Sequence, residues 1–498
     1  MKTWTKLIVC LALTVGTAVA HAGEAKPFSF PRATPESQGV SSAAVLTLVE
    51  ALDQVDAMNS FMLVRHGQVI AEGWWTPYSA LDNHELYSLS KSFTSTAVGM
   101  AVAEGKLSID EEVLKFFPED APANPSANLK AMRVRDLLTM NAGHQDEVST
   151  AADKISAKAF LTNAVPHKPG THFKYNTPAT FMCSAIVQKL TGQTVAEYLK
   201  PRLFEPLGIT QALWNSNWQG INLGGYGLNV RTEDIARFGQ LYLQKGKWNG
   251  KQLIPSGWVE MATSKQVSNG SNPKSDWDQG YGFQFWRCRN GAYRGDGAFG
   301  QYCIVLPEQD AVIAITSGVK DMQAVLNLIW EKLLPAFPLK RVKADAANQS
   351  KLVAKLGSLT VRPAEGAESS ALKSQVFGRK FVFPANEQKL ETITLTPNPS
   401  SKGMTVAIQS GGTTKQFTTG YREWQKGRGS FGSYTNEPAA ATSAWVADDT
   451  LVIKQCFTET PYYVTRKLRF DGNQVLYDAE ANVGFRNTKQ AQLVGRAE

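Results

Sequence analysis

Cysteine is scarce in this sequence, with five residues among 498, and this scarcity excludes a scaffold held together by many disulfides. Cys10 lies in an apolar segment at the start of the chain, which leaves Cys183, Cys288, Cys303 and Cys456. Cys288 and Cys303 are close together on strand-like segments, so they are the best candidates for a disulfide. No Cys/His cluster has metal-ligand spacing and no H-E-x-x-H motif occurs, so we expect no metal ion and no other cofactor.

Runs of basic residues are also missing. The chain has 52 Lys and Arg against 44 Asp and Glu, a formal charge of +8, but this excess is spread thinly and forms no basic helix. Nucleic-acid binding needs a concentrated basic surface. We therefore expect no nucleic-acid partner, while weak attraction to anionic envelope surfaces stays open.

A long apolar run occurs only at the start of the chain, where residues 1–22 have the pattern of a secretory signal. Basic residues precede the apolar stretch Leu7–Val19, and Ala20-His21-Ala22 fits a cleavage site before Gly23. The stretch is too short to favour a membrane anchor, and Cys10 lies inside it rather than at a lipoprotein junction. We expect a mature protein without stable membrane insertion, secreted across the inner membrane to a bacterial periplasm.

Length and patterning predict more than one domain. A chain of 498 residues with 43% hydrophobic content usually forms two or three domains. A helix and two strands before residue 75 and further strands and a helix between 282 and 335 suggest one sheet built from both ends. The expected organisation is a signal peptide (1–22), a mixed α and β domain (23–340) with a helical insert (about 106–230), a linker (341–355) and an all-β domain (356–498).

The stretch from Leu86 to Ser95 carries the chemistry. It places Ser88 and Lys91 where a turn leads into an apolar helix, and residues three apart share one helical face. The lysine can then take the proton of the serine, and free N–H groups at the helix start favour negative charge on a nearby carbonyl oxygen. The spacing alone is weak evidence, because Ser271/Lys274, Ser317/Lys320 and Ser370/Lys373 share it.

Further motifs in chain order give that pair a context. Two strands, then Leu86-Tyr-Ser-Leu-Ser-Lys-Ser-Phe-Thr-Ser95, Val134-Arg-Asp-Leu-Leu-Thr-Met140, Gly225-Tyr-Gly-Leu-Asn-Val230 and Gly297-Ala-Phe-Gly-Gln-Tyr302 resemble the penicillin-recognising, β-lactamase-related serine hydrolases. The likeness covers roughly residues 30–335 and is nearest the 6-aminohexanoate-dimer hydrolase-like and esterase-like members. It implies an α/β (α+β) β-lactamase/D,D-peptidase-like fold, an antiparallel sheet flanked by helices with an inserted helical subdomain. The C-terminal all-β domain lies outside it.

The resemblance assigns catalytic roles by position. Ser88 would be the acylated nucleophile, and Lys91 would accept its proton, which requires a depressed pKa. Tyr175, in Phe173-Lys-Tyr-Asn-Thr177, matches the family tyrosine that passes protons between nucleophile, leaving group and water. The backbone N–H groups of Ser88 and Ala298 would form the oxyanion hole.

The expected substrate pocket departs from the family pattern. Its members here are Asn176, Thr177 and Gly295-Asp296-Gly297, and Thr177 offers a hydroxyl where the family often has an asparagine amide. Strand alternation would aim position 295 at the cleft and 296 away from it. Glycine at 295 supplies no cation for the carboxylate of a β-lactam or peptide, so the sequence favours esters and small amides.

These observations predict an exported serine hydrolase that acts through an acyl-enzyme on a small ester, amide or peptide-like substrate. One alternative is a β-lactamase or D,D-peptidase/penicillin-binding enzyme, and another is a non-catalytic relative that binds ligands in the same cleft. Retention of all three catalytic positions disfavours the binding relative. No G-x-S-x-G elbow occurs, and His84, the histidine nearest Ser88, is expected only at the rim. Natural substrate and oligomeric state stay open.

Overall fold

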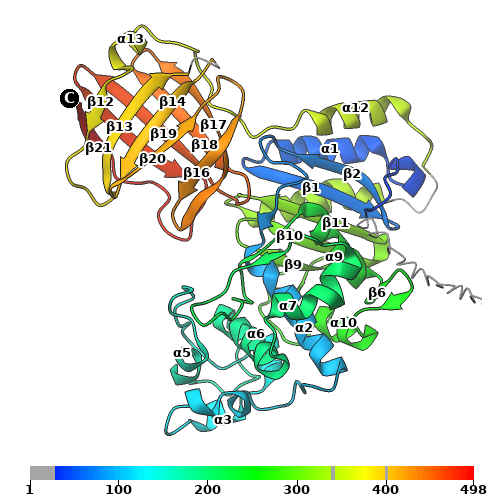
Figure 1. Cartoon of the computed structure of the whole chain (residues 1–498). Coiled ribbons are helices and arrows are strands. Elements are labelled where there is room, and N and C mark those ends of the chain that lie inside the picture. The colour runs from blue at the N-terminus through cyan, green and yellow to red at the C-terminus, as the bar shows by residue number, and fades with distance from the viewer. Residues whose placement is uncertain (1–28, 338–341, 399–401) are drawn as a thin grey trace, which may run out of the picture.

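The computed structural model describes residues 29–337, 342–398 and 402–498, so the predicted signal peptide lies outside the described residues. Within those ranges, no helix is both long and apolar enough to cross a bilayer. Figure 1 shows two parts: an N-terminal domain that mixes helices with a sheet, and a C-terminal domain of strands from β12 to β21.

The N-terminal domain is built on a six-stranded antiparallel sheet in the order β2-β1-β11-β10-β9-β8. The strand β1, next to the edge strand β2, is buried along almost its whole length. It pairs with β2 through a tight turn at His66-Gly67, and with β11 from the far end of the domain. The sheet is therefore assembled from both ends of the domain, as predicted. The strands are β1 (Met58–Arg65), β2 (Gln68–Trp74), β8 (Trp286–Arg287), β9 (Tyr293–Gly297), β10 (Gln301–Leu306) and β11 (Ala311–Ser317).

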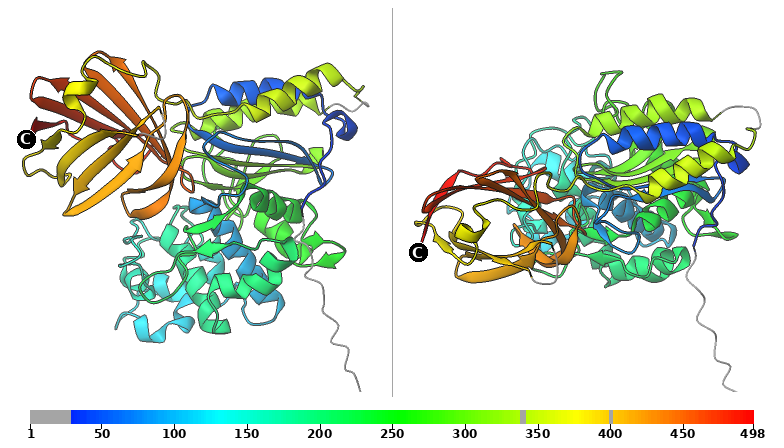
Figure 2. Two further views of the ribbon diagram at one scale, coloured as in Figure 1. Left: turned by 45° about the horizontal axis from the view of Figure 1, so that its top comes forward. Right: turned by 90° about the horizontal axis from the view of Figure 1, so that it is seen from above.

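One face of this sheet is covered by α1 (Ser42–Asp53), α11 (Met322–Leu328) and α12 (Ala346–Gly357) (Figure 2). The segment expected as a linker over 341–355 is instead largely the helix α12, which lies along α1. Leu352 is 2% exposed in this contact, and Lys355 Nζ lies 2.5 Å from Asp53 Oδ2. The helix escaped prediction because it buries a single narrow side and is otherwise polar.

The opposite face carries α2 (Ser90–Ala103) and α9 (Thr232–Leu243), and the helical insert lies beyond them (Figure 1). Every residue of α2 from Ser90 to Met100 is buried, so the helix runs through the core rather than over a surface. The other α-helices and strands of this domain are α3 (Ala127–Ala131), α4 (Val134–Leu138), α5 (Ala157–Thr162), α6 (Thr177–Thr191), α7 (Val195–Leu199), α8 (Glu205–Leu207), α10 (Ser256–Thr263), β3 (His84–Glu85), β4 (Leu213–Trp214), β5 (Leu228–Val230), β6 (Lys247–Trp248) and β7 (Lys251–Gln252).

The C-terminal domain is a strongly curved, ten-stranded antiparallel sheet, which confirms the all-β prediction (Figure 1). Its concave side is filled by a core that includes Phe381, Ile393, Trp445 and Leu468. A short helix, α13 (Lys373–Val376), precedes the strands. These are β12 (Lys380–Val382), β13 (Leu390–Pro397), β14 (Met404–Ser410), β15 (Thr413–Thr418), β16 (Gln425–Phe431), β17 (Tyr434–Ala447), β18 (Thr450–Phe457), β19 (Tyr463–Asp471), β20 (Gln474–Ala481) and β21 (Leu493–Ala497).

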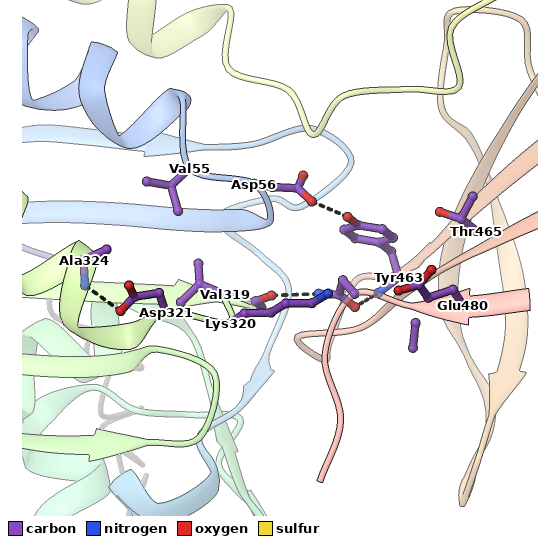
Figure 3. A pocket seen from close by; sticks show the side chains of 12 residues that line it. Val55, Asp56, Val319, Lys320, Asp321, Ala324, Tyr463, Thr465 and Glu480 are labelled. Atoms are coloured by element: carbon purple, nitrogen blue, oxygen red, sulfur yellow. Dashed lines mark hydrogen bonds between the residues drawn. The ribbon is translucent and has the colours of Figure 1, made fainter. Parts of the chain in front are cut away.

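The two domains touch directly around a cavity of about 500 Å³ (Figure 3). At its edge the hydroxyl of Tyr463 donates to the carboxylate of Asp56. The amide of Asn482 donates to the carbonyl of Gly318 at 2.9 Å and accepts from the N–H of Tyr463 at 2.8 Å. These bonds fix β19 and β20 against the end of β11.

The predicted disulfide between Cys288 and Cys303 is wrong, because all four described cysteines are free and buried. Cys303 lies on β10 opposite Gly295, and its Sγ approaches the carbonyl of Ile235 on α9 at 3.5 Å. Cys288 belongs to the apolar cluster on the other face of the sheet, where it contacts Arg294. The sheet thus separates the two thiols.

Candidate active site

Ser88 lies in a short 3-10 turn, Tyr87–Leu89, directly before α2. Tyr87 has φ +47°, in the left-handed region, which bends the chain sharply into the helix. The end of β9 packs against this turn: a Cβ at Gly297 would stand 2.0 Å from the carbonyl oxygen of Leu86 and 3.1 Å from the nitrogen of Ser88. Glycine is required there because any side chain would clash with Leu86. The missing side chain allows the N–H of Ser88 to lie close to the segment that leads into Ala298.

Lys91 extends from the first turn of α2 toward the serine. Its Nζ lies 3.1 Å from Ser88 Oγ, 3.2 Å from Thr177 Oγ1 and 2.8 Å from the carbonyl oxygen of Gly225. The side chain is only 1% exposed, and this burial lowers the pKa of the amine to about 7, against the opposing charges of Glu147 and Asp296. Near neutral pH much of the amine is therefore uncharged and able to accept a proton.

Tyr175 completes the group. The centroid of its ring lies 5.0 Å from Lys91 Nζ. The ring stacks on that of Trp286, with 5.3 Å between the two centroids. Burial and then the charge of Asp296 raise the pKa of the phenol above its usual value, although a hydrogen bond with Ser88 works against them. The phenol therefore stays protonated near neutral pH and can donate. The structure brings together the three residues that sequence analysis proposed as catalytic.

Position 295 does not open onto a cleft as expected. A Cβ there would lie 2.4 Å from Leu89 Cδ1 and 2.6 Å from Ser92 Oγ, so the position faces the packed start of α2. Asp296, expected to point away from the site, is buried; its Oδ2 accepts from Arg294 Nε at 2.8 Å, and its charge acts on Lys91. Strand alternation could not reveal how closely α2 approaches β9.

Asn176 also differs from its expected pocket role. Its side chain is buried, and Oδ1 accepts the N–H of Ala179 at 3.2 Å, so it caps the start of α6. An asparagine two residues before Pro178 is a typical helix-start signal, and it could have been read from the sequence. Thr177, by contrast, contacts Lys91 and lies beside Ser88 and Tyr175.

Two residues at the site escaped sequence analysis. Glu147, in the loop after α4, accepts the N–H of Thr177 through Oε1 at 2.7 Å, and its charge acts on Lys91. Trp286 supports Tyr175 from β8. Neither stands in a motif, because a single residue on a loop or an edge strand leaves no periodic signal.

The glycine-rich crossing at 224–225 allows close packing. A Cβ at Gly225 would lie 2.7 Å from Thr177 Cγ2, and at Gly224 it would lie 2.8 Å from Ser184 Cβ. The expectation for His84 is wrong, because this histidine is buried rather than at the rim. Its Nε2 lies 3.3 Å from Asn59 Oδ1, and burial lowers its pKa to about 4. In the described part of the chain, no His, Cys, Asp and Glu side chains gather in a way that could hold a metal ion.

Comparisons with known proteins agree with this architecture. The family model described as Beta-lactamase matches residues 47–327. The 6-aminohexanoate-dimer hydrolase of Paenarthrobacter ureafaciens is 26% identical over 316 residues, which cover 58% of this chain and 80% of that protein. Sequence analysis had reached the same family and the same neighbourhood within it.

The chain was also compared with solved structures. A candidate 6-aminohexanoate-dimer hydrolase from Bacillus anthracis is 22% identical, with a TM-score of 0.51, over 61% of this chain and 86% of its own. The octameric penicillin-binding protein homologue from Pyrococcus abyssi is 14% identical, with a TM-score of 0.47, over 91% of this chain and 99% of its own. The first likeness confirms the predicted β-lactamase-like fold.

Proposed function

The chain belongs to the beta-lactamase family, and we propose that it is an exported serine hydrolase that cleaves a small ester or amide through an acyl-enzyme. The observation that carries this proposal is the contact between Lys91 Nζ and Ser88 Oγ at 3.1 Å, with the amine buried. A buried lysine of depressed pKa beside a serine hydroxyl has little structural value, since burial of an amine is costly. It is what a general base requires.

Acylation would begin when neutral Lys91 takes the proton of Ser88 Oγ. The oxygen attacks the substrate carbonyl carbon, and the N–H groups of Ser88 and Ala298 would stabilise the oxyanion. Tyr175 gives its proton to the leaving alcohol or amine as the bond to the carbonyl carbon breaks, and it is reprotonated from Lys91. The products of this step are the Ser88 ester and the free leaving group.

Deacylation would run the same path with water. The uncharged Lys91 takes a proton from water through Tyr175, hydroxide attacks the Ser88 ester, and the proton returns to Ser88 Oγ as the acid leaves. The raised pKa of Tyr175 supports its role as a donor that never persists as phenolate. Tyr175 is thus a relay, and Lys91 is the base in both halves.

Substrate choice is proposed from the lack of a free cation on β9. Position 295 faces the packed start of α2 and has no side chain, and the guanidinium of Arg294 is already paired with the buried Asp296. A substrate that depends on a carboxylate anchor is disfavoured here. The name of the Paenarthrobacter relative refers to a dimer of 6-aminohexanoate, which makes short linear amides a natural part of the test panel.

Export rests on the sequence of residues 1–22, with its short apolar stretch and Ala20-His21-Ala22. The mature protein would begin at Gly23 and act outside the cytoplasmic membrane. Amino-terminal sequencing of protein recovered from a periplasmic fraction tests this part, and a chain that keeps its first residues in the cytoplasm contradicts it.

A fluorophosphonate probe tests the chemistry. The wild type should be labelled on the peptide that contains Ser88, and Ser88→Ala should lose the label and at least about 10³-fold in ester hydrolysis. Ser271→Ala is the matched control, because exposed Ser271 has the same spacing to Lys274 and should behave as wild type. Labelling that survives in Ser88→Ala, or is absent from the wild type, removes the proposal.

A substrate panel separates the remaining alternatives. We expect turnover of p-nitrophenyl esters and short amides to exceed that of nitrocefin and D-amino-acid amides. Rapid nitrocefin hydrolysis would favour the β-lactamase alternative. Tight binding of panel compounds with no turnover and no label would favour the non-catalytic alternative.

A further inference from the structure

The C-terminal domain packs on the two residues that flank the proposed oxyanion hole. Tyr87 precedes Ser88, and Phe299 follows Ala298. Both rings pack against aromatic side chains of the C-terminal domain. The ring centroid of Phe299 lies 5.8 Å from that of Tyr462 and 4.9 Å from that of Phe485, and the centroid of Tyr87 lies 5.7 Å from that of Phe485. The C-terminal domain therefore contacts the residues that adjoin Ser88 and Ala298 in the chain.

A chain of hydroxyl groups joins the domains at the same place. Tyr462 Oη lies 2.6 Å from Tyr87 Oη, Tyr87 Oη lies 3.0 Å from Tyr434 Oη, and Tyr434 donates to the carboxylate of Glu85. A carboxylate only accepts, and each phenol has one proton, so all the directions are fixed. Tyr434 donates to Glu85, Tyr87 donates to Tyr434, and Tyr462 donates to Tyr87.

Backbone strain lies at both ends of this contact. Tyr87 has φ +47° and Phe299 has φ +68°, and aromatic residues avoid this left-handed region. Such conformations persist only where surrounding contacts hold them. At Tyr87 those contacts include the hydroxyls of Tyr434 and Tyr462, and at Phe299 they include the ring of Tyr462.

A backbone contact anchors the same region. The N–H of Glu85 donates to the carbonyl of Glu459 at 2.9 Å, and the hydroxyl of Tyr78 donates to the carbonyl of Thr460 at 3.2 Å. The loop that leads into Tyr462 is thus bound to the strand that leads into Ser88. These hydrogen bonds hold the segments of both domains that carry the hydroxyl chain.

We infer that the C-terminal domain is part of the construction of the active site, with Tyr434 and Tyr462 as positioning residues that hold the Ser88 and Ala298 N–H groups in their reactive geometry. This inference rests on the proposed hydrolase function. The two tyrosines act through Tyr87 and Phe299. Their loss would misplace the oxyanion donors while leaving the Lys91 and Tyr175 side chains in place.

Kinetics of Tyr462→Phe and Tyr434→Phe test the inference. Oxyanion donors act on the transition state, so we expect kcat for a p-nitrophenyl ester to fall about 10-fold or more while KM changes less than about twofold. The rate of fluorophosphonate labelling should fall in parallel, because the phosphonyl oxygen uses the same donors. Both substitutions keep the ring, so melting temperatures should stay near that of the wild type.

Tyr463→Phe is the matched control. It also removes a hydroxyl bond between the domains, to Asp56, but it lies at the cavity of Figure 3 and outside the hydroxyl chain. It should keep wild-type kcat. Wild-type kcat in both test variants, or an equal loss in Tyr463→Phe, would overturn the inference while leaving an active wild type and the proposed function intact. A wild type that neither turns over esters nor takes the label would overturn both.

Discussion

The amine of Lys91 lies 3.1 Å from the hydroxyl of Ser88, and the lysine side chain is almost fully buried. Ser88 lies in the 3-10 turn that leads into α2 and Lys91 lies in the first turn of α2, so the three-residue spacing brings the two side chains to the same side. The burial follows from the insert, which covers the lysine with Thr177 and Gly225. The start of the helix therefore sets the distance between Ser88 and Lys91, and the insert, by burying the amine, sets the pKa of Lys91.

The pH dependence of hydrolysis should report on Lys91. Its pKa is lowered to about 7 by burial, and only the uncharged amine accepts a proton. We expect kcat/KM to rise with pH through an apparent pKa of about 7, measured with a p-nitrophenyl ester between about pH 5 and pH 9. Lys91→Arg should lose about 10²- to 10⁴-fold, since a guanidinium stays charged. A flat wild-type profile would exclude Lys91 as the base.

Glu147→Gln should shift that profile to lower pH. The charge of Glu147 raises the pKa of Lys91, in opposition to burial, so its removal lowers the pKa further. Glutamine keeps an oxygen that can accept the N–H of Thr177. Asp146→Asn, at the exposed neighbouring position, is the control and should leave the profile unchanged. A shift to higher pH, or an equal shift in both variants, would contradict the assignment.

Gly295→Ala should destabilise the protein, even though it adds one methyl group. The new Cβ would meet Leu89 at 2.4 Å and Ser92 at 2.6 Å, and overpacking of this kind costs about 1–3 kcal/mol. Gly257→Ala is the control: Gly257 is in α10 with no atom within 4 Å of a Cβ, so alanine should be neutral or stabilising by up to about 1 kcal/mol. Urea unfolding measures both. Equal stability of Gly295→Ala and the wild type would show that position 295 has room.

Leu352→Ala tests whether α12 is part of the N-terminal domain. Leu352 is 2% exposed, whereas its neighbour Val353 is 63% exposed. Removal of the buried leucine should cost about 2–4 kcal/mol, and Val353→Ala should stay within about 0.5 kcal/mol of the wild type. Thermal unfolding measures the difference. A pair of variants with the same stability would make α12 a connecting segment after all.

Sequence analysis predicted the fold, and it named three side chains that the structure brings together, because both depend on ordered, local patterns. The strands before residue 75 and the helix after Ser88 each have a periodicity, and the order of the motifs places Tyr175 at the right distance along the chain. The chemistry of a nucleophile, a base and a relay demands particular residue types. Those demands are readable without coordinates.

The remaining features depend on contacts between distant segments, which no local pattern records. The two thiols at 288 and 303 lie in separate apolar clusters on opposite faces of one sheet, and only the folded chain reveals this. Glu147 contacts Thr177 from a loop, and Tyr434 contacts Tyr87 from another domain. Asn176 is the exception, because its capping role could have been recognised from the following Thr177-Pro178.

The position of β1 has a consequence for how the chain assembles. β1 pairs on one side with its neighbour β2 and on the other with β11, so Phe61 stands opposite Ile315. During synthesis the first hairpin has no second partner until residues 311–317 have been made. More than half of the polypeptide must therefore exist before the central sheet can close, and loop closure on this scale slows folding. A truncated chain that ends before β11 would expose a hydrophobic strand edge and aggregate rather than fold.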